Sequence, residues 1–201
     1  EIGSGLVGSE MCIRDRNIAR PIRDMVERDN KVVVMSPCGY LASVRIPAQE
    51  IVDKYYATDF DLAVVNNLVL TIPARSITND YGLRPAPNLL LVRRCDMTSF
   101  FANNEIPDAS KKSFYGSYNT ATGKYTFSSM RQYIVDLLAE GKTVKEEDMD
   151  FVLIPVDIAS ETNTMTGAVY VTNCLPYIYR PTLCELDLSR ASLCFTFGTK
   201  H

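Results

Sequence analysis

The sequence predicts a mainly β protein, an antiparallel β-sandwich or jelly-roll-like fold with one inserted amphipathic helix at about residues 129–140. Short runs rich in β-branched and aromatic residues recur along the chain, and Gly, Pro and Asn separate them. Only one segment has strong helical spacing. A fold of alternating strands and helices would need helices between most strands, and the sequence has too few of them.

The strand-like runs are spread over the whole chain. They lie, in order, at 31–35, 40–46, 62–72, 89–93, 115–118, 124–127, 151–156, 168–172 and 193–197. In the third run Leu68, Leu70 and Ile72 alternate with polar or smaller residues, which predicts that they share one face, and Pro73 is expected to end the strand. Short helical turns are expected at 48–56 and 96–102.

The strongest turn signal connects the runs at 115–118 and 124–127. The five residues Asn119–Gly123 read Asn-Thr-Ala-Thr-Gly, a composition typical of a hairpin loop. The predicted helix follows directly. Ser129 and Gln132 form a capping-box pattern, and Gly141 stands where a C-terminal glycine is expected. The apolar face of this helix is expected to pack on the sheet, and it consists of Tyr133, Ile134, Leu137 and Leu138.

The first sixteen residues differ from the rest. They contain the hexapeptide Glu10–Asp15, EMCIRD, which resembles the translation of a transposon-end adaptor used in sequencing libraries. We therefore expect residues 1–16 to be an adaptor-derived artefact rather than a domain. A natural glycine-rich leader is the alternative. Residues 17–201 are then expected to form a single β-rich domain, truncated from the C-terminal part of a longer protein.

Composition excludes several kinds of function. The net charge of −3 provides no broad basic field, so we expect no nucleic-acid partner. The single histidine is His201, the last residue, and a Ser-His-Asp triad or a histidine metal site would have to use that terminus. No apolar run reaches the length of a membrane-spanning helix. The sequence indicates no cofactor and no metal.

Five cysteines lie outside the adaptor-like segment, at positions 38, 95, 174, 184 and 194. They contain no C-x-x-C spacing, so neither a zinc ribbon nor a thioredoxin-type motif is indicated. Cys184 and Cys194 flank a predicted turn, which allows a disulfide between them in an oxidising compartment. The alternative is that these cysteines are small buried hydrophobic residues with free thiols.

Two acidic clusters are candidate sites. Asp59 with Asp61, and the run Glu146–Asp150, could supply oxygen ligands to calcium or a catalytic carboxylate pair. Neither has the spacing of an EF-hand loop, and the sequence favours a solvated acidic loop for each.

Aromatic residues in predicted loops are the better binding candidates, because exposed rings can anchor a protein or stack on a sugar. The candidates for this role are Tyr177, Tyr179 and Tyr118. The alternative is that these rings cover the edges of the sandwich.

Several sequence blocks follow one another in order along the chain. They are Ser36–Gly39, Asn66–Pro73, Pro87–Leu91, Gly116–Tyr118 with Tyr125–Phe127, the helix carrying Arg131 and Tyr133, Phe151–Pro155 and Leu193–Phe197. Taken in this order, they resemble a family of outer-membrane lipoproteins of the Bacteroidota, catalogued as domain of unknown function 4270. The resemblance covers most of residues 32–197, and residues 173–190 fit it poorly.

The resemblance implies an exported cell-envelope lipoprotein, periplasmic or surface-exposed, with no established activity. The chain lacks the family's signal peptide and lipid-bearing cysteine, so its membrane attachment would depend on an anchor missing from this sequence. The function expected is non-catalytic binding or scaffolding, with an envelope protein or a glycan as partner. Two alternatives stay open: a carbohydrate-active enzyme using a carboxylate pair, and a structural adhesin or surface-layer subunit that polymerises through an edge strand such as 193–197.

Overall fold

The computed structural model describes residues 4–5, 16–37, 39–57, 63–107, 112–128 and 130–199. In this part of the chain the strands form one eleven-stranded sheet, and every pair of strands is antiparallel. The predicted mainly β, antiparallel class is confirmed. The strands are β1 (Ser4–Gly5), β2 (Val32–Ser36), β3 (Leu41–Arg45), β4 (Ala63–Ser76), β5 (Asn88–Arg93), β6 (Ser113–Asn119), β7 (Lys124–Phe127), β8 (Asp150–Thr162), β9 (Val169–Pro176), β10 (Thr182–Leu186) and β11 (Ser192–Thr199).

The sheet bends until its two ends approach each other. Its strand order is β1-β3-β8-β5-β6-β7-β4-β10-β2, with β11 paired to β4 and β9 paired to β8. Near one end of this path the N–H of Met35 in β2 donates to the carbonyl oxygen of Tyr40, just before β3 at the other end, at 2.9 Å. The main core lies on the face of the sheet against which α2 (Ala48–Ala57) and α4 (Arg131–Glu140) pack, which we call the inner face. β1 falls within the adaptor-like residues 1–16, and its two-residue pairing with β3 does not test their origin.

Four α-helices pack against this sheet in the described part of the chain. α2 buries Ala48, Ile51 and Val52, and α4 buries Tyr133, Ile134 and Leu137. Both therefore lie where the apolar spacing predicted a helix. α3 (Met97–Ala102) follows the short 3-10 turn η1 (Arg94–Asp96). α1 (Arg16–Glu27) was not predicted, and its Ile22 and Val26 pack with Val33 of β2 in a small separate core. No helix among the described residues is long and apolar enough to cross a bilayer.

Two details of the sequence reading are corrected. The strand expected to end at Pro73 continues to Ser76, because residues 74–76 pair with β10, which follows β11 along the edge of β4 opposite to β7. The expected capping box is not used: the N-cap residue of α4 is Met130, without a side-chain hydrogen bond, and Ser129 lies outside the described residues. The other end of α4 is as expected, since Gly141 has a φ of 126°.

Strand β5 and the first half of β8 are buried on both faces. In β8, Phe151 and Leu153 face the main core, whereas Val152, Ile154 and Val156 face a second core on the outer side of the sheet. α3 covers this outer core with the buried side chain of Phe100. Burial on both faces explains why these two strands read as nearly continuous apolar runs rather than alternating ones.

A buried ion pair joins these layers. Arg93, at the end of β5, contacts the carboxylates of Asp96 and Asp148, and Asp148 is 1% exposed. Burial opposes the charge on Arg93, but the hydrogen bonds to the two carboxylates outweigh it and raise the pKa of the guanidinium. The hydroxyl of Tyr133 in α4 donates to the carbonyl oxygen of Asp148 at 2.8 Å. This group therefore ties β5, α4 and η2 (Glu146–Asp148) together.

Replacing Asp148 tests how much this ion pair contributes to the free energy of unfolding. We expect Asp148→Ala to lower the free energy of unfolding by about 3 kcal/mol, because a buried guanidinium loses one of its two partners. Asp150→Ala is the matched control. It removes an exposed ion pair with Arg94 and should cost about 0–1 kcal/mol. Urea denaturation measures both, and equal losses would contradict the assignment.

Candidate functional site

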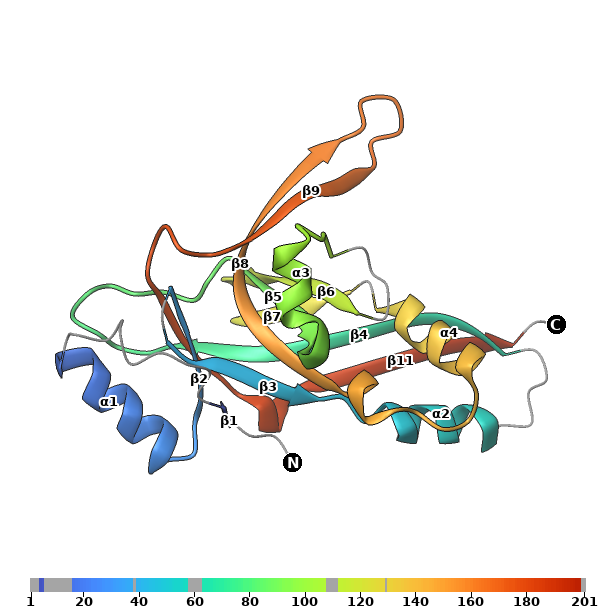
Figure 1. Cartoon of the computed structure of the whole chain (residues 1–201), viewed down its shortest axis with the longest axis horizontal. Helices are drawn as coiled ribbons and strands as arrows, with labels where there is room; N and C mark the ends of the chain where they lie inside the picture. Colours follow the sequence, from blue (N-terminus) through green and yellow to red (C-terminus); the bar gives the residue numbers. More distant parts are fainter. Residues whose placement is uncertain are drawn as a thin grey trace.

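A β-hairpin formed by β8 and β9 projects away from the body of the protein (Figure 1). β8 pairs with β3 over Asp150–Leu153 and with β5 over Phe151–Val156, and beyond Val156 it pairs only with β9. Strand β8 is thirteen residues long, whereas its neighbours β3 and β5 are five and six residues long. The second half of β8 therefore extends beyond the sheet. We call residues 157–176 the arm.

The tip of the arm is a well-defined turn. The side-chain oxygen Oδ1 of Asn163 accepts hydrogen bonds from the N–H groups of Met165 and Thr166, and Gly167 closes the turn with a φ of 70°. The β6–β7 hairpin has the same turn: Oδ1 of Asn119 accepts from the corresponding two N–H groups, and Gly123 has a φ of 65°. The turn sequences are Asn-Thr-Met-Thr-Gly and Asn-Thr-Ala-Thr-Gly.

The two faces of the arm differ in composition. Residues opposite one another in an antiparallel pair lie on the same face of the sheet. One face continues the outer core, and it carries Ile158 with Cys174, Ser160 with Val171 and Thr162 with Val169. The other face carries Asp157 with Leu175, Ala159 with Asn173 and Glu161 with Tyr170. The hydroxyl of Tyr170 donates to Glu161 at 3.0 Å.

Exposed apolar side chains are concentrated on the arm and on the segment that follows it. Nine large hydrophobic residues are exposed in the described part of the chain, and six of them lie between residues 165 and 179. Val169 lies on one face of the arm, and Tyr170 and Leu175 lie on the other. Exposed apolar side chains gathered on one projecting element mark an interaction site more often than single exposed residues do. We call these six residues the arm surface: Met165, Val169, Tyr170, Leu175, Ile178 and Tyr179.

Two of the three predicted binding aromatics lie at the base of the arm. Tyr179 is 70% exposed, and Tyr177 is half-buried. The backbone of Tyr177 is fixed: its N–H donates to the carbonyl oxygen of Pro155 at 3.0 Å, and its own carbonyl oxygen accepts from the hydroxyl of Ser36. These bonds attach the segment after β9 to β8 and β2, so Tyr179 is presented from an anchored loop.

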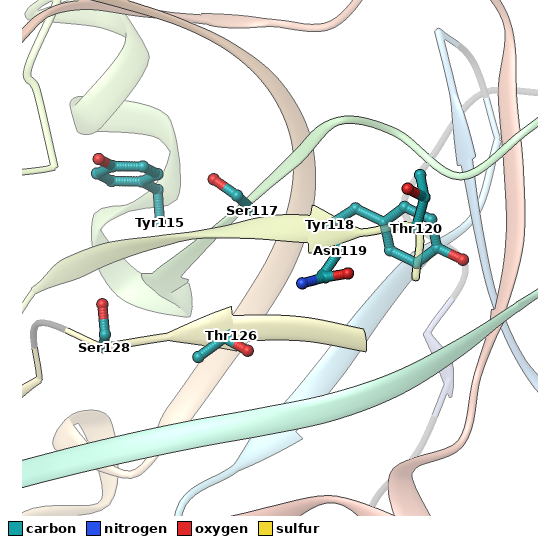
Figure 2. Close-up of a pocket in the computed structure, with 7 residues that line it drawn as sticks. All are labelled: Tyr115, Ser117, Tyr118, Asn119, Thr120, Thr126 and Ser128. Carbon is teal, nitrogen blue, oxygen red and sulfur yellow. The ribbon is translucent and has the colours of Figure 1, made fainter. Parts of the chain in front are cut away.

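Tyr118, the third predicted aromatic, lies elsewhere. Its ring packs against that of Tyr125, with centroids 5.0 Å apart, and it borders an open hollow of about 550 Å³ on the β6–β7 hairpin. Neither Tyr177 nor Tyr179 lines this hollow. Figure 2 shows Tyr115 and Ser117 extending to one side of β6. The lining is polar and uncharged, and it consists of Tyr115, Ser117, Tyr118, Asn119, Thr120, Thr126 and Ser128.

The disulfide allowed between Cys184 and Cys194 is not formed. Both thiols are free; Cys184 is buried and Cys194 is exposed. Cys184 lies opposite Ser76 of β4, and Cys194 lies opposite Val69 of the same strand. Seven residues of a strand correspond to roughly 23 Å, several times the Cα separation that a disulfide allows. The turn between the two cysteines suggested a hairpin, but β10 and β11 follow one another along the same edge of β4.

The acidic run Glu146–Asp150 is used for ion pairs. Glu146 binds Arg45 at 2.6 Å, Asp148 binds Arg93, and Asp150 binds Arg94 at 2.7 Å. These carboxylates therefore hold η2 against β3 and β5 rather than facing each other across a cleft. The described residues contain no cluster suited to holding a metal ion. Asp59, Asp61, Cys38 and His201 lie outside the described residues.

Comparison with known proteins gives no relative. No protein-family model matches the chain, and no curated protein and no solved structure matches it. The family resemblance drawn from the sequence blocks therefore stays a prediction.

The state of the cysteines can be checked by alkylation without a reductant. Burial raises the pKa of the Cys184 thiol to about 12, so at pH 8 roughly one molecule in ten thousand carries the reactive thiolate there. We expect Cys194 to be alkylated in the native protein and Cys184 only after denaturation. Mass spectrometry of the peptides measures both, and a linked Cys184–Cys194 peptide would contradict the strand register.

Proposed function

We propose that this protein is a non-catalytic binding or scaffolding domain of an exported cell-envelope lipoprotein, and that the arm surface binds a protein partner. The envelope location rests on the sequence resemblance alone. The binding role is supported by one observation above all: six of the nine exposed large hydrophobic side chains of the described residues lie on the projecting hairpin or on the short segment that follows it.

The turn at the tip of the arm can be compared with the turn of the β6–β7 hairpin. Met165 is 94% exposed and occupies the turn position that Ala121 occupies in the β6–β7 hairpin. Both turns make the same hydrogen bonds, so the turn does not require a large side chain there. A fully exposed methionine adds nothing to the stability of the isolated fold, and flexible Met side chains are common on protein-binding surfaces.

A protein partner suits the arm better than a lipid surface. Beyond Val156 the ribbon consists of β8 and β9 only, so each strand has one edge without a partner strand among the described residues. Unpaired backbone N–H and C=O groups are costly in the hydrocarbon region of a bilayer. A polypeptide partner can satisfy these groups and cover the apolar side chains at the same time.

Selection from a random peptide display library tests this role. The protein is immobilised sparsely, so that copies cannot meet. We expect the selected peptides to alternate apolar residues, as an added strand would. They should bind Val169→Lys at least tenfold more weakly, because the lysine charge would have to be buried. Ile106→Lys changes an exposed hydrophobic residue that is not part of the arm and should bind as the unmodified protein does. Equal binding by both variants would contradict the proposal.

A glycan is the second candidate partner, and the hollow beside Tyr118 supports it. Uncharged hydroxyl and amide groups beside aromatic rings are the groups that hydrogen-bond and stack on sugars. We expect Thr126→Arg, which fills the hollow, to abolish any binding to a glycan array, whereas Val169→Lys should leave such binding unchanged. Binding that survives Thr126→Arg would remove the hollow as the site.

A further inference from the structure

We propose that the partner of the arm is a second copy of this chain, with the free edges of two β9 strands pairing antiparallel about a two-fold axis at Tyr170. This inference rests on the proposed function, because it takes the arm surface as the binding surface. It names the partner and the register of the contact.

The free edge of β9 lacks the usual protection against strand pairing. In the described part of the chain β9 pairs with β8 alone. Edge strands are normally protected by lysine, by proline or by a covering element. From Val169 to Leu175 the strand contains no charged residue and no proline, and Pro176 stands only at the end nearest the body. A continuous four-stranded sheet would satisfy this edge, whereas a two-stranded ribbon is marginally stable in water.

The register follows from a bulge in β9. The pairing with β8 skips Thr172, so the alternation of faces reverses there: Val169 and Val171 share the face of Cys174, whereas Tyr170 shares that of Leu175. Two copies of β9 must keep matching faces together. Pairing centred on Tyr170 does so, because it places Val169 opposite Val171 of the second copy and the two Tyr170 residues opposite each other.

The tip half of β9 is also the accessible half. Val169 is 64% exposed and Tyr170 is 50% exposed. A two-fold axis at Cys174, nearer the body, would also keep matching faces together, but Cys174 is only 3% exposed. Aromatic pairs and β-branched pairs are among the favourable cross-strand neighbours. The contact would therefore join one aromatic pair on one face with two valine pairs on the other.

Charge does not oppose this pairing, although each chain has a net charge of −3. The nearest charged side chain is Glu161, which lies opposite Tyr170 on β8. In the four-stranded sheet the two Glu161 residues would be three strand spacings apart, about 14 Å. That separation exceeds the screening length of about 8 Å at physiological salt, so their repulsion would be weak.

Cysteine cross-linking tests the register directly. Tyr170→Cys is placed in the full chain after the exposed Cys95 and Cys194, together with Cys12 and Cys38, have been changed to serine. Opposite residues of an antiparallel pair have Cβ atoms within about 5.5 Å, so mild oxidation should give a covalent dimer in most of the protein. Leu175→Cys in the same background is the control. Its two copies would be about 33 Å apart and should not link.

Sedimentation of the unmodified protein gives an independent measurement. We expect the mass to rise from 22.5 kDa towards twice that value with concentration, and Val169→Lys to stay monomeric. A monomer at all concentrations, or equal cross-linking at 170 and 175, would overturn the proposal. If the selected peptides still bind the arm in that case, the arm keeps its binding role and only the second copy is excluded. If peptide binding also fails, the proposed function falls with it.

Discussion

The length of β8 determines that one part of this strand lies in the core and the other part projects as an arm. The strand has thirteen residues, whereas β3 has five and β5 has six. Its first half is buried on both faces and holds the two cores together, and its second half has only β9 beside it. Hydrogen bonding to β9 satisfies one edge of that half and leaves its side chains in water. The arm therefore forms because β8 is longer than the strands beside it. The apolar side chains of the arm surface stay exposed, because no other described segment covers them.

The body of the protein is built to hold that strand firmly. Phe151 of β8 packs with Phe114 and Tyr133 in an aromatic cluster, with ring centroids 5.7 to 6.4 Å apart. On the outer side α3 covers the same strand, and the Arg93 ion pairs fix the turns at its start. These contacts fix the position and direction from which the arm projects, although the arm itself is only a two-stranded ribbon.

The sequence patterns predicted the class, the inner face of β4 and the helices α2 and α4, because alternation and helical spacing depend on local burial. They missed the arm, although its turn repeats the Asn-Thr-x-Thr-Gly signal recognised at 119–123. The runs beside the second turn look short and separate in the sequence, since the polar residues 160–162 hide the extension of β8. The sequence singles out Tyr177 and Tyr179 because two tyrosines between prolines stand out, and their binding role stays a prediction. Their neighbours on the arm surface become visible only when exposure is known, and the distance between Cys184 and Cys194 depends on strand order, which no local pattern contains.

We expect the arm to be a marginal ribbon that becomes stable when its surface is covered. Amide hydrogen exchange measured over a range of protein concentrations tests this expectation. Amides of β5 and of the first half of β8 should exchange slowly at every concentration. Exchange in residues 157–176 should be fast in dilute protein and slow down as the concentration rises. Slow exchange in the arm that does not depend on concentration would contradict this expectation, because the ribbon would then be stable without a partner.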